Sequence, residues 1–93
     1  MSEPRATRTV TVENEEGIHV RAADLIAKQV RRFDAKVVLT KDSRRVEGTD
    51  VLQILSLGTL PGDQVVLEAD GADAEEVLDA LTRLFADGFG PNE

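Results

Sequence analysis

Residues 17–33 read GIHVRAADLIAKQVRRF, and the rest of the chain is arranged around this stretch. From Val20 to Phe33 apolar residues recur at helical spacing on one face, and charged residues occupy the other. The pattern predicts an amphipathic helix over 20–33 that begins at or just after His19. Gly17, shortly before it, is suited to a backbone conformation that other residues resist.

Outward from this helix, the other elements follow from alternation, helical spacing and turn residues. Strands are expected at Thr7–Val12, Ala35–Thr40, Arg44–Glu47 and Gln64–Asp70, and helices at Asp50–Leu57 and from Asp73 to Gly88. Capping boxes are expected at both helix starts, Asp50 with Gln53 and Asp73 with Glu76. Phe89 to Glu93 reads as a tail. The order β-α-β-β-α-β-α predicts an α+β fold, with helices covering one face of a single antiparallel or mixed sheet.

Length and composition limit the class of protein. Ninety-three residues make one small domain over 1–93, with residues 1–5 and 90–93 as expected flexible tails. The chain has no run of about 18 apolar residues for a membrane span, no apolar segment of a secretory signal after Met1, and no cysteine. Together these features favour a cytoplasmic protein.

Charge is distributed unevenly along the chain. The formal net charge of −7 argues against nucleic acid as the main partner. Residues 17–45 nevertheless carry eight basic and three acidic side chains, against one basic and eleven acidic in residues 46–93. A positive block around His19 suits an anionic ligand or an acidic partner, although a solvated helix face would explain the same charges.

His19 is the only histidine, and it stands at the start of the expected helix. Such an end binds phosphate, which the backbone amides of Val20 and Arg21 would hold while the Arg21 guanidinium neutralises its charge. A neutral imidazole offers one nitrogen as a nucleophile, so a reversible phosphohistidine is one interpretation. The other is a histidine that only caps the helix or packs against it. A lone histidine makes a poor metal site, and neither a metal nor a cofactor is expected.

The short helix expected at 50–57 has apolar residues almost all the way round. Eight residues cannot bury every face in so small a domain. Val51, Leu52 and Leu55 are therefore expected to stay exposed as a docking patch for partners. The alternative is a helix sandwiched in the core.

Three stretches together resemble a known family. Residues 17–23 read GIHVRAA, residues 56–58 read SLG, and residues 71–73 read GAD ahead of an acidic helix. The first is similar, at five of seven positions, to the G-[LIM]-H-A-R-P-A signature of the HPr family, the histidine-containing phosphocarriers of the bacterial sugar phosphotransferase system, and of its nitrogen-branch relatives. The resemblance implies an open-faced β-sandwich, with four antiparallel strands and three helices on one face.

The resemblance also implies a function. His19 would accept a phosphoryl group on its δ1 nitrogen from phospho-Enzyme I and pass it to a IIA-type protein, with Arg21 neutralising the charge. The protein would be a carrier without enzymatic turnover, and a monomer is expected. Val20 and Ala22 replace the family's usual alanine and proline, which bears on the rate of transfer. Asp50 stands where many Gram-positive members carry a serine that HPr kinase modifies, so regulation of that type is expected to be absent.

Two other functions stay open. One is a regulatory HPr-like protein that binds partners with weak or lost phosphotransfer, although the chain retains both His19 and Arg21. The other is a small enzyme such as an acylphosphatase, which would want an arginine loop near an amide side chain. The only asparagines, Asn14 and Asn92, adjoin no such loop. The sequence also leaves open whether the sugar or the nitrogen branch is served.

Overall fold

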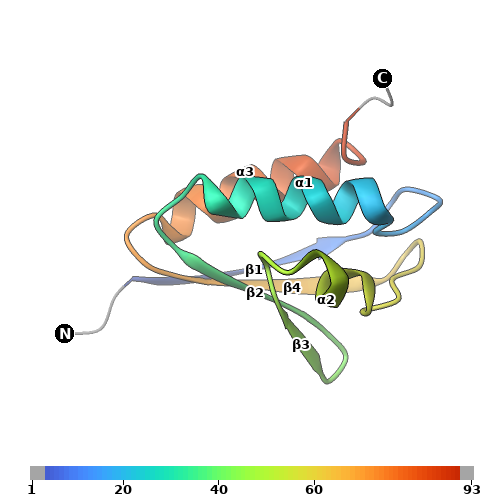
Figure 1. Cartoon of the computed structure of the whole chain (residues 1–93), viewed down its shortest axis with the longest axis horizontal. Helices are drawn as coiled ribbons and strands as arrows, with labels where there is room; N and C mark the ends of the chain where they lie inside the picture. Colours follow the sequence, from blue (N-terminus) through green and yellow to red (C-terminus); the bar gives the residue numbers. More distant parts are fainter. Residues whose placement is uncertain (1–3, 91–93) are drawn as a thin grey trace.

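The computed structural model describes residues 4–90. Its elements follow the expected order: β1 (Arg5–Thr11), α1 (Val20–Arg31), β2 (Lys36–Lys41), β3 (Arg44–Glu47), α2 (Val51–Leu55), β4 (Gln64–Asp70) and α3 (Ala74–Ala86). The strands form one antiparallel sheet in the order β1-β4-β2-β3. α1 and α3 lie side by side along the sheet, and α2 packs against α1 and β3 (Figure 1). The α+β fold expected from the sequence is confirmed.

Side chains alternate between the two faces of the sheet. In β4, Val65, Leu67 and Ala69 are buried, whereas the residues between them are half-buried. The helices complete the core with their apolar stripes, namely Ala22, Ala23, Ile26, Ala27 and Val30 in α1 and Ala74, Val77, Leu78, Leu81 and Phe85 in α3. Alternation of buried and less buried residues is expected for a strand with one face on the core, and a single apolar stripe is expected for a helix that covers it.

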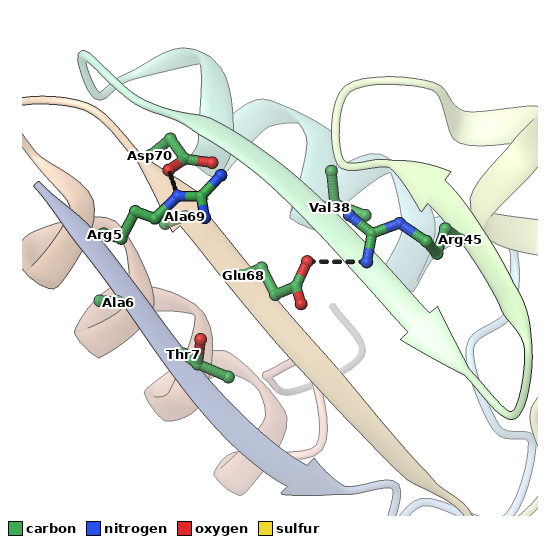
Figure 2. Close-up of a pocket in the computed structure, with 8 residues that line it drawn as sticks. All are labelled: Arg5, Ala6, Thr7, Val38, Arg45, Glu68, Ala69 and Asp70. Atoms are coloured by element: carbon green, nitrogen blue, oxygen red, sulfur yellow. Dashed lines mark hydrogen bonds and ion pairs between the residues drawn. The ribbon is translucent and has the colours of Figure 1, made fainter. Parts of the chain in front are cut away.

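The opposite face of the sheet is polar and holds an open cavity of about 300 Å³. Two ion pairs cross it: Arg5 Nε lies 2.5 Å from Asp70 Oδ1, and Arg45 Nη1 lies 2.9 Å from Glu68 Oε1 (Figure 2). These pairs join β1 to β4 and β3 to β4. The first pair joins neighbouring strands and the second reaches across β2. Such exposed pairs stabilise a solvated sheet face modestly.

The helices are shorter than the apolar pattern predicts. α1 ends at Arg31, because the N–H groups of Arg32 and Phe33 bond back three residues, to Gln29 and Val30. α2 ends at Leu55 in the same kind of tight turn, and Gly58 follows with φ +63°. An apolar stripe continues through such a turn, so it does not mark where the helical hydrogen bonding stops.

The two expected capping boxes have different outcomes. Asp50 caps α2, since its Oδ1 accepts a hydrogen bond from the Gln53 N–H at 3.1 Å. The box expected at the start of α3 is wrong. Asp73 makes no side-chain cap, and its Oδ2 accepts instead from the N–H of Asp34 at 2.7 Å. Its own N–H donates to the Asp34 carbonyl at 3.0 Å, so this carboxylate ties two loops together.

The N-terminal end of the described residues contributes to the sheet. Arg5 is the first residue of β1, and the Pro4 carbonyl accepts a hydrogen bond from the Gly71 N–H at 2.9 Å. The rest of the expected tails, residues 1–3 and 91–93, lies outside the described residues. Within residues 4–90 no helix has the length and apolar character to cross a membrane.

Candidate functional site

His19 is the N-cap residue of α1. Its backbone is extended (φ −85°, ψ −178°), its carbonyl accepts the first helical hydrogen bond from Ala23 at 2.9 Å, and its Nδ1 accepts from the Ala22 N–H at 3.2 Å. The side chain is 27% exposed. The capping interpretation is therefore correct as geometry. It does not remove the chemical one, because the ring still reaches solvent at the amide-rich end of the helix.

The capping bond also assigns the proton of the neutral ring. Nδ1 acts as an acceptor, so the proton of a neutral imidazole belongs on Nε2. The carboxylate of Glu16 lies 3.9 Å from Nε2. His19 also lines an open cavity of about 260 Å³, together with Asn14, Glu15, Glu16 and Gly88. Among residues 4–90, no group of three or more His, Cys, Asp and Glu side chains could hold a metal ion.

Gly17 brings the chain into α1 along a path that excludes any side chain. Its φ is +64°, and a Cβ built on it would overlap the carbonyl oxygen of Thr59. The next residue is tied to the same place, because the Ile18 N–H donates to Thr59 Oγ1 at 2.8 Å. The direction in which His19 leaves the loop thus depends on close packing against the segment after α2 (Figure 1).

The Arg21 side chain bonds to the segment that follows α3. Its Nη1 donates to the carbonyl oxygen of Phe89 at 3.2 Å. Phe89 was expected in a tail, and that expectation is wrong. It is 1% exposed, and its ring packs edge-on against Phe85 and His19, with centroids 4.9 and 6.4 Å apart. The sequence did contain a signal for this burial: Phe89 stands between two glycines. Gly88 and Gly90 allow the chain to turn back after α3 and carry the aromatic side chain to the core.

The expected docking patch is exposed only in part. Leu52 is 78% exposed, but Val51 and Leu55 are half-buried and pack against the core, so their expected exposure is wrong. A short helix over the sheet edge still buries one side of its apolar set. Sequence reasoning missed two exposed apolar residues near the site, Val20 at 66% and Leu60 at 65%. Both are apolar residue types that also occur in the core, so the sequence does not show that they are exposed.

A charged cluster holds the segment after α2, which carries Thr59. Lys41 Nζ donates to the Gly58 carbonyl at 3.1 Å and lies 3.1 Å from Asp63 Oδ2. The same carboxylate oxygen accepts from the Leu60 N–H at 2.8 Å. The hydrogen bond from Leu60, followed by the one from Lys41, lowers the pKa of Asp63 below its usual 3.8.

We expect this cluster to make stability depend on pH. Because folding lowers the pKa of Asp63, its contribution is full above the unfolded-state pKa and is lost as the pH falls through the folded-state value. Urea unfolding of wild type and Asp63→Asn from pH 7 downward should give a constant difference in unfolding free energy above about pH 5, shrinking below it. A difference that is equal at pH 7 and at about pH 2 would contradict this role.

Comparison with known proteins identifies the family. Residues 6–87 match the family model described as "PTS HPr component phosphorylation site". The chain belongs to the HPr family. It is 36% identical over 83 residues to phosphocarrier protein NPr of Escherichia coli, covering 88% of this chain and 92% of the relative. It is 34% identical over 82 residues to phosphocarrier protein HPr of Treponema pallidum, covering 88% and 93%.

Solved structures agree with this assignment. A crystal structure of HPr from Thermoanaerobacter tengcongensis superposes with a TM-score of 0.87 at 32% identity, covering 95% of this chain and 99% of that one. The chain also aligns with a longer relative, the multiphosphoryl transfer protein of Haemophilus influenzae, at 31% identity, but spans only 17% of its length. Membership of the HPr family supports a phosphocarrier role in a phosphotransferase system, with other proteins of such a system as partners.

Proposed function

We propose that His19 accepts a phosphoryl group on Nδ1 from phospho-Enzyme I and passes it to a IIA-type protein. The observation that carries this proposal is the placement of Nδ1 at the start of α1, 3.2 Å from the backbone nitrogen of Ala22 in the first turn. A phosphoryl group on that nitrogen would replace the bond to Ala22. Its oxygens would then lie at the positive end of the helix dipole, near the Val20 and Arg21 amides.

The transfer needs no oxidant and no metal-bound intermediate. The Nδ1 lone pair of His19 attacks the phosphorus of the donor's phosphohistidine, a new N–P bond forms, and the donor's N–P bond breaks. The leaving imidazole of the donor keeps that electron pair, and the reverse sequence delivers the group to the acceptor. The Arg21 guanidinium neutralises the phosphoryl oxygens. The protein is thus a carrier, and catalysis of the exchange is shared with its partners.

Three exposed apolar residues on α1, α2 and the segment after α2 suit a partner surface. Val20 and Leu52 are exposed on α1 and α2, two helices in contact, and Leu60 is exposed on the segment after α2. We propose that Leu52 docks Enzyme I and IIA-type proteins, with the half-buried Val51 and Leu55 supporting it from the same helix. A transient contact of this kind fits a cytoplasmic monomer that exchanges partners.

Leu52→Ser should weaken binding of Enzyme I about tenfold, because an exposed leucine at the centre of an interface is buried on binding. The free energy of unfolding should change by less than about 0.5 kcal/mol, since Leu52 is exposed in the free protein. Binding is measured by calorimetry, with Thr7→Ala on the open sheet face as the control. Unchanged affinity in Leu52→Ser would remove Leu52 from the docking surface.

The aspartate at position 50 is the reason to expect no regulation by phosphorylation of a serine there. It offers no hydroxyl at the N-cap of α2, and its carboxylate already accepts the Gln53 N–H. The Arg31 guanidinium donates to the neighbouring Thr49 carbonyl at 2.9 Å. We expect HPr kinase to leave position 50 unmodified.

The test is incubation with purified Enzyme I and phosphoenolpyruvate, followed by mass spectrometry under neutral conditions. The expected result is one acid-labile phosphoryl group on His19, which a IIA-type protein then removes. Binding of Enzyme I without any label would favour the regulatory alternative and overturn the proposal. Label on another residue would overturn it as well. Sugar-branch and nitrogen-branch Enzyme I should be compared in the same assay.

A further inference from the structure

The residues Gly88, Phe89 and Gly90 form a C-terminal hook that turns back over the start of α1 (Figure 1). All three have left-handed backbone angles, with φ of +61°, +66° and +78°. Glycine adopts such angles readily, but Phe89 does so at a cost, which surrounding contacts must offset. The Phe89 N–H donates to the Leu84 carbonyl at 2.9 Å, and the Gly90 N–H donates to the Asp87 carbonyl at 3.2 Å.

Phe89 contacts both functional groups of the candidate site, by two different parts of the residue. Its ring lies edge-on to the His19 imidazole, with centroids 6.4 Å apart and planes at 71°. The same ring is held from behind by Phe85 at 4.9 Å. Its carbonyl oxygen accepts from Arg21 Nη1 at 3.2 Å. Gly88 lines the same open cavity as His19, so the hook also borders that cavity.

We propose that Phe89 is a positioning residue for phosphoryl transfer. Its buried ring fixes the plane of the imidazole, so that Nδ1 stays directed at the first turn of α1. Its carbonyl holds the guanidinium beside the site until phosphoryl oxygens take its place. This inference rests on the proposed function of His19. It assigns a role to the end of the chain, where left-handed strain at a buried aromatic residue has no other evident use.

The variant Phe89→Leu tests the role of the ring separately from the role of the carbonyl. It removes the ring but retains the backbone acceptor and the same left-handed strain. The maximal rate of phosphorylation by Enzyme I should fall about tenfold, because a loosened ring samples fewer reactive orientations. The KM for Enzyme I should stay within about twofold, since Phe89 is buried and outside the docking surface. Phe33→Leu is the matched control. Phe33 is half-buried and follows the other end of α1, and this control should keep the wild-type rate.

Amide hydrogen exchange reports the same effect without phosphotransfer. The Ala22 N–H bonds to the His19 ring, whereas the Ala23 N–H bonds to the His19 carbonyl. In Phe89→Leu, exchange at Ala22 should rise about threefold or more, while Ala23 stays at its wild-type value. A general loss of stability would raise both equally. If Phe89→Leu does not fold, Phe89→Met fills the same space without a ring and replaces it.

A wild-type rate in Phe89→Leu, an equal fall in Phe33→Leu, or equal changes at Ala22 and Ala23 would each overturn the inference. The proposed function can fail separately. A wild-type protein that takes no phosphoryl group would overturn that function and the transfer half of this inference. The exchange comparison would still decide whether the Phe89 ring holds His19.

Discussion

Replacing His19 with asparagine is expected to abolish phosphorylation by Enzyme I while leaving the fold as stable as before. Asparagine is among the best N-cap residues, so its side chain can take over the hydrogen bond from the Ala22 N–H. It carries no ring nitrogen that could accept a phosphoryl group. The label is read by mass spectrometry, and stability by urea unfolding.

His19→Ala provides the comparison that separates capping from chemistry. It lacks both the nucleophile and the cap, so it should take no label and be about 1 kcal/mol less stable than His19→Asn. Retained labelling in His19→Asn would show that another residue carries the phosphoryl group. Loss of the fold in His19→Asn would show that the His19 ring is needed for stability beyond its capping hydrogen bond.

Gly17→Ala is expected to be the most damaging of the single substitutions considered. The new Cβ would overlap the Thr59 carbonyl oxygen, and alanine disfavours φ +64°. The left-handed backbone and the overpacking together should cost about 2–4 kcal/mol. Because the shift also breaks the Ile18–Thr59 hydrogen bond, His19 should be displaced and phosphorylated more slowly.

Gly58→Ala is the matched control, since Gly58 has φ +63° but nothing lies within 4 Å of an added Cβ. It should lose about 1 kcal/mol, the cost of the left-handed backbone alone. Thermal or urea unfolding measures both variants. Equal losses at the two glycines would contradict the close approach of Gly17 to Thr59.

The sequence predicted those features that repeat along the chain. Alternation in β4 and helical spacing in α1 and α3 each involve several residues, so one exception does not hide the pattern. The start of α1 at Val20 and the Asp50 cap of α2 were equally readable, because both depend on neighbours within one turn. The position of His19 at the start of α1 followed from the same local pattern.

The features that could not be predicted depend on contacts between distant residues. Phe89 reaches His19 across 70 positions of sequence, and Asp73 bonds to Asp34 rather than to its own helix. Local rules favoured a tail and a capping box at these places. The partial burial of Val51 and Leu55 likewise depends on where α2 meets the core, which the composition of α2 alone does not state.

The proposed carrier function depends on Nδ1 of His19 receiving the phosphoryl group. Phosphorus–nitrogen couplings in the nitrogen-labelled, phosphorylated protein, measured by NMR at neutral or alkaline pH, identify the bonded ring nitrogen directly. We expect coupling to Nδ1, together with loss of the hydrogen bond from the Ala22 N–H. A phosphoryl group bonded to Nε2, on the side of Glu16, would contradict it.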